Sequence, residues 1–349
     1  DWLQNHCCCE ENQNYFNTLV PIYDLDKLNN QLSHTDELFK ALSRKDLIIE
    51  TKLKNISKPI SSLDIEGGYI EIDELSQIKD MANYHIDLVK YFKGTQFKIW
   101  RNMIPDTSSS KRIIDKINKV LDNELSIKHS ASKELKKICQ KIREVNQKIE
   151  TTTAYELNKY IKLGYLRDNK TVFRSGKTLL PINTSNKNKV KGIIDSFSST
   201  HQTCFIQPIS LVELNNRMNE LLSEQKKEVV KILIKLTADI STHKSRIEET
   251  YNLIKYYDIH ATVANFAIVL EAIKPQFKDQ LILKDSINPL FSLNKKIYVP
   301  LNISIKDRST TIVISGPNSG GKTIVIKSIG LYAVMAQCGL YIPASTAIL

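Results

Sequence analysis

Two long stretches that lack both glycine and proline constrain the fold of this 349-residue chain more than any other feature. They span residues 110–161 and 210–274, and apolar side chains recur in both at three- to four-residue spacing. That spacing is typical of amphipathic helices, and a helix over 210–258 would be about 70 Å long at 1.5 Å per residue. We therefore expect two long helices.

The segment between these stretches has a different composition. Residues 162–209 contain three glycines and two prolines, and short apolar runs stand at 171–173, 179–182, 193–194 and 204–206. Such runs predict short strands joined by turns, with a polar, basic loop at 183–192. Ser210 and Glu213 match a capping box, so the returning helix is expected to begin at Ser210. Helix, small β module and returning helix together predict a long antiparallel arm.

The N-terminal region predicts a small packed helical domain. Residues 1 to about 105 indicate short helices separated at Pro21, Pro59, Gly67–Gly68 and Pro105. Residues 73–92 carry an apolar stripe at helical spacing, and this stripe defines one face of a helix. Its members are Leu75, Ile78, Ala82, Ile86, Val89 and Phe92.

Composition restricts the class of protein. The net charge of +11 permits an anionic partner such as nucleic acid, although a solvated lysine-rich surface gives the same balance. No run of about 18 apolar residues and no signal-peptide pattern is present in the sequence, which argues against a membrane protein. The adjacent Cys7–Cys9 are poorly spaced for a tetrahedral metal site, so reduced thiols in a cytosol-like compartment are expected. The chain runs from Asp1 to Leu349 without an initial methionine, and we expect a fragment of a longer protein.

The most specific motif is G-x-x-x-x-G-K-T at residues 316–323. It follows a β-branched run at 310–315, which predicts a buried parallel strand, and it precedes a helical pattern through Ile324, Ile326, Ile329 and Ala333. Glycines let such a loop wrap closely around phosphates, and the helix N-terminus attracts their charge. Lys322 would reach the β- and γ-phosphates, and the Thr323 hydroxyl would ligate Mg²⁺.

The motif thus predicts ATP and Mg²⁺ as cofactors, with Thr323 as the metal ligand. The expected nucleotide-binding residues are Gly316, Pro317, Asn318, Ser319, Gly320, Gly321, Lys322 and Thr323. Hydrolysis also needs an acidic motif on another strand, and only 26 residues follow Thr323. No complete catalytic set is therefore expected, and this segment should bind nucleotide without hydrolysing it alone.

Beyond the motif, GPNSGGKT with the following IVIKSIGLYAVMAQCGLYIPA resembles the ATPase start of the MutS family of DNA mismatch repair proteins. The phrase GL-x-IPA, residues 339–344, is similar to the second branch of that family. SFSSTHQTCFIQPISLVELNN at 196–216 and GGYIEIDEL at 67–75 resemble that branch's clamp-to-lever junction and N-terminal core. One departure is Ile287-Asn288-Pro289-Leu290, which stands where the family commonly has Arg-His-Pro.

The resemblance implies a mostly α fold with an α/β P-loop ATPase start, in which two lever helices carry a small clamp. Its implied divisions are an N-terminal helical core at 1–107, a first lever helix at 108–161, a β-containing clamp-like module at 162–209, a returning lever helix and core at 210–282, and the N-terminal part of a truncated P-loop domain at 283–349. A C-terminal nuclease-like module of that branch is not expected within these residues.

The function that the resemblance implies is that of an ATP-dependent DNA-binding protein, acting in mismatch repair or recombination suppression as a sensor of DNA damage. Its clamp would enclose branched or mismatched duplex DNA under the control of ATP. The full-length protein would be a homodimeric ATPase of the bacterial cytosol or nucleoid, or of an equivalent organelle, with no membrane partner. Near the clamp, phosphate contacts are expected from Lys170, Lys187, Lys189 and Lys191, although a solvated loop would show the same lysines.

Two other functions remain open at this stage. A ribosome-associated ATPase that splits stalled ribosomes is linked to the same branch, and charge and clamp length do not separate it from a DNA-binding protein. A coiled-coil structural ATPase would also have a long helical arm. In that class the P-loop usually lies near the N-terminus and the arm follows it, whereas here the arm comes first, which disfavours this alternative.

Overall fold

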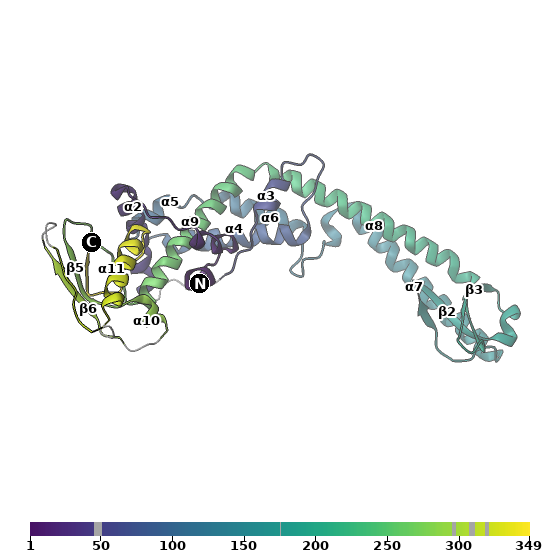
Figure 1. The fold of residues 1–349 in the computed structure, drawn as a ribbon. Coiled ribbons are helices and arrows are strands. Elements are labelled where there is room, and N and C mark those ends of the chain that lie inside the picture. The colour runs from purple at the N-terminus through teal and green to yellow at the C-terminus, as the bar shows by residue number, and fades with distance from the viewer. Residues whose placement is uncertain (45–50, 175, 295–297, 307–310, 318–320) are drawn as a thin grey trace. The chain divides into compact units, whose positions relative to one another are not determined.

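The computed structural model describes residues 1–44, 51–174, 176–294, 298–306, 311–317 and 321–349. These residues are mostly helical, with two small antiparallel sheets (Figure 1). They divide into two compact units, the first made of 1–64, 73–115 and 240–349 and the second of 65–72 and 116–239. None of the described helices combines the length and the apolar content that a membrane-spanning segment requires.

The first unit consists of helices from both ends of the chain and a three-stranded sheet. Its helices are α1 (Trp2–His6), α2 (Leu25–Ser43), α3 (Ser57–Ser62), α4 (Ile72–Phe92), α5 (Lys98–Met103), the first part of α6 (Ser108–Val120), α9 (Lys244–Val269), α10 (Pro289–Leu293) and α11 (Lys322–Gln337). The sheet has the order β6-β5-β7, formed by β5 (Leu281–Ser286), β6 (Leu301–Ile305) and β7 (Thr346–Ile348). All of its pairings are antiparallel.

The predicted helix over 73–92 is confirmed by α4. Four of the six predicted stripe residues are buried, namely Leu75, Ile78, Ala82 and Phe92, while the other two are half-buried. Helix α2, with 19 residues, is longer than the short helices expected for this region. Pro59 does not separate helices but lies in the first turn of α3, where a missing N–H leaves no helical hydrogen bond unmade.

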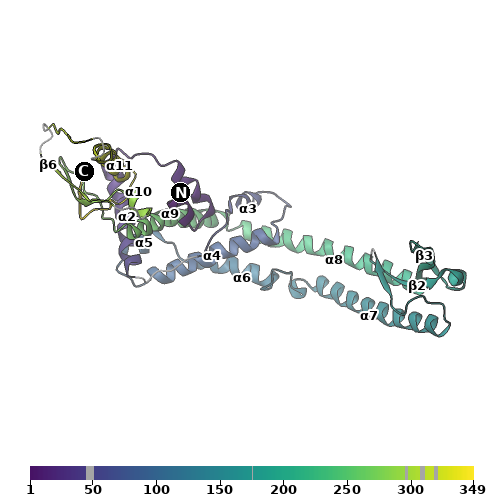
Figure 2. The ribbon, with the colours of Figure 1, turned by 60° about the horizontal axis from the view of Figure 1, so that its bottom comes forward.

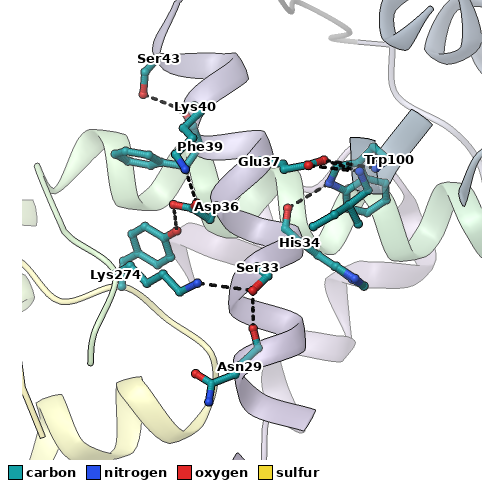
Figure 3. A network of polar contacts seen from close by, with 12 residues as sticks. Asn29, Ser33, His34, Asp36, Glu37, Phe39, Lys40, Ser43, Trp100 and Lys274 are labelled. Atoms are coloured by element: carbon teal, nitrogen blue, oxygen red, sulfur yellow. Dashed lines mark hydrogen bonds and ion pairs between the residues drawn. The ribbon is translucent and has the colours of Figure 1, made fainter. Parts of the chain in front are cut away.

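Polar side chains of helix α2 form hydrogen bonds with several neighbouring segments (Figure 3). The Asp36 carboxylate accepts from Lys40 at 2.6 Å and from the Tyr341 hydroxyl at 3.3 Å, which ties α2 to the segment after α11. The Glu37 carboxylate accepts the N–H groups of Ile99 and Trp100 at the start of α5. Because α2 bonds to both neighbours, three parts of the sequence meet on one helix.

A buried carboxylate on α9 fixes the N-terminal residues. Asp258 is 2% exposed, and its oxygens accept from the backbone N–H of Cys8 at 2.7 Å, from that of Cys9 at 3.0 Å and from the Asn12 amide at 2.8 Å. Burial raises the pKa of Asp258 despite these donors. The cysteine triplet therefore contributes backbone N–H groups to a structural anchor. Nearby, burial lowers the pKa of His260 to about 3, so this residue is neutral where it contacts Thr35 at 2.8 Å.

The second unit contains most of α8 (Ile209–Ser241), all of α7 (Lys133–Lys162) and a four-stranded sheet. The strands are β1 (Val172–Arg174), β2 (Lys177–Asn183), β3 (Gly192–Phe197) and β4 (Thr203–Pro208), in the order β1-β2-β4-β3. Each covers or overlaps one of the predicted apolar runs, so the prediction of short strands is confirmed. The basic loop between β2 and β3 contains a 3₁₀ helix, η4 (Thr184–Lys189).

Helices α7 and α8 run antiparallel beside each other, with the sheet at one end of the pair (Figures 1 and 2). The Ser210 hydroxyl donates to Glu156 at 2.8 Å near the sheet, and the Ser132 hydroxyl donates to Glu228 at 2.7 Å at the other end. Beside the second of these contacts, Leu135 and Cys139 of α7 share an apolar cluster with Ile232 of α8. The expected out-and-back pair of helices is therefore present in this unit.

The prediction of one continuous helix over 108–161 is wrong. Helix α6 ends at Val120 and α7 begins at Lys133. The Asp122 carboxylate accepts the N–H groups of Glu124 and Ser126, and the Ser132 hydroxyl caps α7 by accepting the N–H of Leu135. Short polar side chains offer the backbone these local partners, so they end and restart a helix without glycine or proline.

The returning helix is also interrupted, since α8 ends at Ser241 and α9 begins at Lys244. The N–H of His243 bonds the carbonyl of Ile240 at 2.8 Å and closes a turn at this point. Three successive residues of low helix propensity, 241–243, account for the break. The capping box is a second correction, because α8 starts at Ile209 and the Ser210 hydroxyl donates to Glu156.

Gly192 is required by the close approach of β3 to β4. A Cβ at this position would lie 2.4 Å from Ile206 Cγ2 and 2.5 Å from the carbonyl oxygen of Gln207. We expect Gly192→Ala to destabilise the second unit by about 1–3 kcal/mol because backbone must move to relieve the clash. Gly330→Ala on α11 is the matched control, since open space surrounds that position and alanine favours a helix by about 1 kcal/mol. Urea unfolding of both variants would measure this, and equal effects would contradict the prediction.

Candidate nucleotide-binding site

The segment that leads into the glycine-rich motif is not a strand. Residues 311–315 have no strand structure, and Thr310 lies outside the described residues. The side chains of Ile312, Val313 and Ile314 are exposed, Val313 by 85%. A strand needs neighbouring strands to pair its N–H and C=O groups, and no described strand of the β6-β5-β7 sheet pairs with this segment. The predicted strand at 310–315 is therefore wrong for the part that the structure describes.

The glycine-rich loop meets α11 as the sequence predicted. Gly316 and Gly321 have φ values of 149° and 82°, a region that side chains disfavour, and open space lies where a Cβ would stand on either residue. The Lys322 ammonium donates to the carbonyl of Gly316 and so crosses the base of the loop. Thr323 is exposed in the first turn of α11. Pro317 is exposed as well, whereas Asn318, Ser319 and Gly320 lie outside the described residues.

The start of α11 has the chemistry that phosphate binding requires. Its cap residue is Gly321, which offers no side-chain acceptor to the N–H groups of the first turn. Such N–H groups point away from the helix with the positive end of its dipole, and an anion would satisfy them. With Lys322 as a cation and the Thr323 hydroxyl as a possible Mg²⁺ ligand, the described donors fit the phosphates and metal of ATP.

Asn288 holds α11 in place through a hydrogen bond to this helix. The sequence analysis did not predict it as a site residue. Its carboxamide oxygen caps α10 by accepting from Leu290 at 3.0 Å, and its amide donates to the hydroxyl of Ser328 at 2.9 Å. Ser328 is buried on α11, less than two turns after Lys322. The signal in the sequence was Asn288-Pro289 after an apolar run, because Asn at the cap and Pro at the first position mark a helix start.

The far end of α11 is closed by a Schellman motif. Gly339, with φ 76°, donates its N–H to the carbonyl of Ala336 at 3.0 Å, and Leu340 donates to that of Met335 at 2.9 Å. The chain then turns back, and Leu340, Tyr341 and Ile342 enter the apolar cluster of the first unit. The residues of the GL-x-IPA phrase thus form the turn after α11 and supply apolar side chains that pack in the core of the first unit.

The four lysines predicted to contact nucleic acid lie in the second unit. Lys187 and Lys189 are on η4, Lys191 follows it, and Lys170 precedes β1. Within the described residues no carboxylate lies within ion-pair distance of any of them, whereas Lys177 on β2 pairs with Asp195 at 3.3 Å. Their positive charge is therefore available to an external anion.

Curated relatives match the chain over nearly its whole length. Endonuclease MutS2 of Fusobacterium nucleatum subsp. nucleatum is 31% identical over 344 residues, which cover 96% of this chain and 43% of the relative. The protein of that name from Agathobacter rectalis is 28% identical over 353 residues, covering 98% of the chain and 44% of the relative. The one from Caldicellulosiruptor bescii is 28% identical over 349 residues, with the same coverage. These matches support a MutS2-type family for this chain. No family model matches it.

These matches confirm the resemblance that the sequence indicated to the second branch of the MutS family. The chain spans less than half the length of the MutS2 relatives that it matches. The glycine-rich motif, the helices and the antiparallel sheets described above lie in the part that this chain shares with them.

Proposed function

We propose that this chain is the part of a MutS-type protein that binds Mg²⁺–ATP through Gly316–Thr323 and structured DNA through the β1–β4 module. The observation that carries the proposal is the start of α11, where a left-handed glycine, Lys322 and Thr323 stand in sequence at an uncapped helix N-terminus. Similarity to MutS2 proteins supports it, since the match covers 96–98% of the chain. Mismatch repair and recombination suppression are the processes in which we expect this binding to act.

The segment before the loop exposes three apolar side chains, those of Ile312, Val313 and Ile314. Because a contiguous apolar surface is usually covered by another part of a protein or by a partner, we expect a further surface to cover these side chains in the working ATPase. Hydrolysis, and the dimer that we expect to complete the site, would belong to the longer protein.

DNA binding is supported by charge and by the form of the β module. Lys187, Lys189 and Lys191 place three positive charges on the loop between β2 and β3. Lysines without carboxylate partners neutralise phosphates and release counterions, which favours binding without regard to sequence. The proposed substrate is branched or mismatched duplex DNA.

Loss of Lys322 should weaken nucleotide binding. We expect Lys322→Ala to weaken binding of a fluorescent ATP analogue in Mg²⁺ at least about tenfold, because alanine cannot donate a charge-assisted hydrogen bond to phosphate. Lys327→Ala on the same helix is the matched control and should bind as the wild type does. Fluorescence titration measures both affinities. Equal binding by wild type and Lys322→Ala, or no binding by the wild type, would contradict the proposed site.

Removal of the four lysines of the β1–β4 module should weaken DNA binding and make the affinity less dependent on salt concentration. In the variant with Lys170, Lys187, Lys189 and Lys191 changed to Ala, the slope of log affinity against log salt should fall by roughly 0.9 for each phosphate that the protein no longer neutralises. The control changes Lys27, Lys40, Lys58 and Lys90, each paired with a carboxylate, and removes the same charge. Fluorescence anisotropy with a branched DNA gives both slopes. The same slope in both variants would argue against DNA binding by this module.

A further inference from the structure

An exposed aromatic pair stands at the open edge of the four-stranded sheet. Phe197 ends β3, which is an edge strand, and its side chain is 38% exposed. The ring of His201, in the turn between β3 and β4, lies with its centroid 5.8 Å from that of Phe197, and the two planes differ by 37°. The Lys187 ammonium lies 5.7 Å from the centroid of the Phe197 ring. We call these three residues the Phe197 platform.

The platform is not simply the rim of the core beneath the sheet. That core consists of Tyr160, Val190 and four strand residues, namely Leu180, Ile182, Cys204 and Ile206. Among the described residues, those that pack against it from its margin are Leu157, Tyr165 and Leu166. Phe197 instead contacts a histidine and a lysine. The Phe197 ring, 38% exposed beside a cation, therefore lies outside this core.

The turn that carries His201 is held in place by hydrogen bonds. His201 has φ 57°, and its N–H donates to the carbonyl of Ser198 at 2.9 Å. The carbonyl of His201 accepts from the Thr184 hydroxyl at 2.7 Å, and Ser198 N–H bonds the carbonyl of Thr203 at 2.9 Å. A left-handed residue other than glycine is uncommon, although histidine adopts this conformation more readily than most. The imidazole is thus pre-positioned beside Phe197, which lowers the entropy lost when a ligand binds.

The chemistry of the platform selects one kind of partner. A flat aromatic face binds another π-face by stacking, and Lys187 supplies a positive charge beside the Phe197 ring. Nucleotides combine a planar base with a phosphate, so they match both features. In a continuous duplex the bases stack on one another and offer no free face, whereas bases in single strands, loops and junctions do.

We propose that Phe197 and His201 stack on an unpaired base while Lys187 neutralises a neighbouring phosphate. The β1–β4 module then selects nucleic acid that contains unpaired nucleotides, in DNA or in RNA, over blunt duplex. This inference rests on the proposed binding of nucleic acid by the same module, and it names the substrate feature that the module recognises. Stacking on one or two bases gives a preference that is tolerant of sequence.

The test measures the affinity of the chain for four probes by fluorescence anisotropy. The probes are a 20-nucleotide single-stranded DNA, the RNA of the same sequence, the blunt duplex and the duplex with a three-nucleotide bulge. The main variant combines Phe197→Leu with His201→Asn, since asparagine tolerates the left-handed conformation. Phe173→Leu on β1 is the matched control, because Phe173 is 74% exposed on the same sheet. Phe197→Tyr keeps an aromatic ring. If the double variant loses binding because stacking is lost, Phe197→Tyr should retain that binding.

We expect the double variant to bind the single-stranded and bulged probes about tenfold more weakly, with an unchanged salt slope and unchanged affinity for blunt duplex. Phe173→Leu and Phe197→Tyr should bind all probes as the wild type does. Wild-type affinity in the double variant, or an equal loss on every probe, would overturn the platform. If the lysine variant loses binding while the double variant does not, DNA binding stands and the platform fails. If the wild type binds no probe, both proposals fail. The DNA and RNA arms show which nucleic acid is preferred.

Discussion

The packing of α11 on the helical core is the interaction on which the candidate nucleotide site depends. An isolated helix of 16 residues is marginal in water, so the first turn at Lys322 and Thr323 needs support from the rest of the helix. That support comes from one apolar cluster, which joins Leu28 and Leu32 of α2, Phe266 of α9, and Tyr332 and Met335 of α11. Asn288 adds a polar contact to buried Ser328. The loop residues at the helix start are thereby placed on a rigid element.

In the second unit, polar side chains set where the helices end and how α7 and α8 are joined. Asp122 and Ser132 end one helix and start the next, and serine-to-glutamate hydrogen bonds join α7 to α8 near both ends. The small sheet packs its apolar face against α7 through Tyr160 and leaves an edge open. Two features of this module carry the proposed contacts with nucleic acid. They are the lysines of the loop between β2 and β3 and the Phe197 platform.

Much of this fold could be predicted from the sequence because the spacing of apolar residues shows which face of a helix or strand is buried. The α4 helix, the four short strands of the second unit and the helix after the glycine-rich loop all follow from that spacing. Helix breaks at 121–132 and 242–243 could not be predicted from glycine and proline alone, since Asp122 and Ser132 break the first by hydrogen bonding. The run at 310–315 has the composition of a buried strand, but a strand forms only where a neighbour pairs with it. For the candidate site, the loop motif identified Gly316, Gly321, Lys322 and Thr323, whereas Asn288 required the tertiary structure.

The most direct test of the central claim is hydrogen–deuterium exchange of the chain with and without Mg²⁺–ATP. If the loop at the start of α11 binds phosphates, amides in 316–325 should exchange more slowly when nucleotide is present, because phosphate oxygens accept from the first-turn N–H groups. The second half of α11 should be protected in both states, since the apolar cluster already holds it. Unchanged exchange over 316–325 at saturating nucleotide, or protection confined to another region of the chain, would contradict this account.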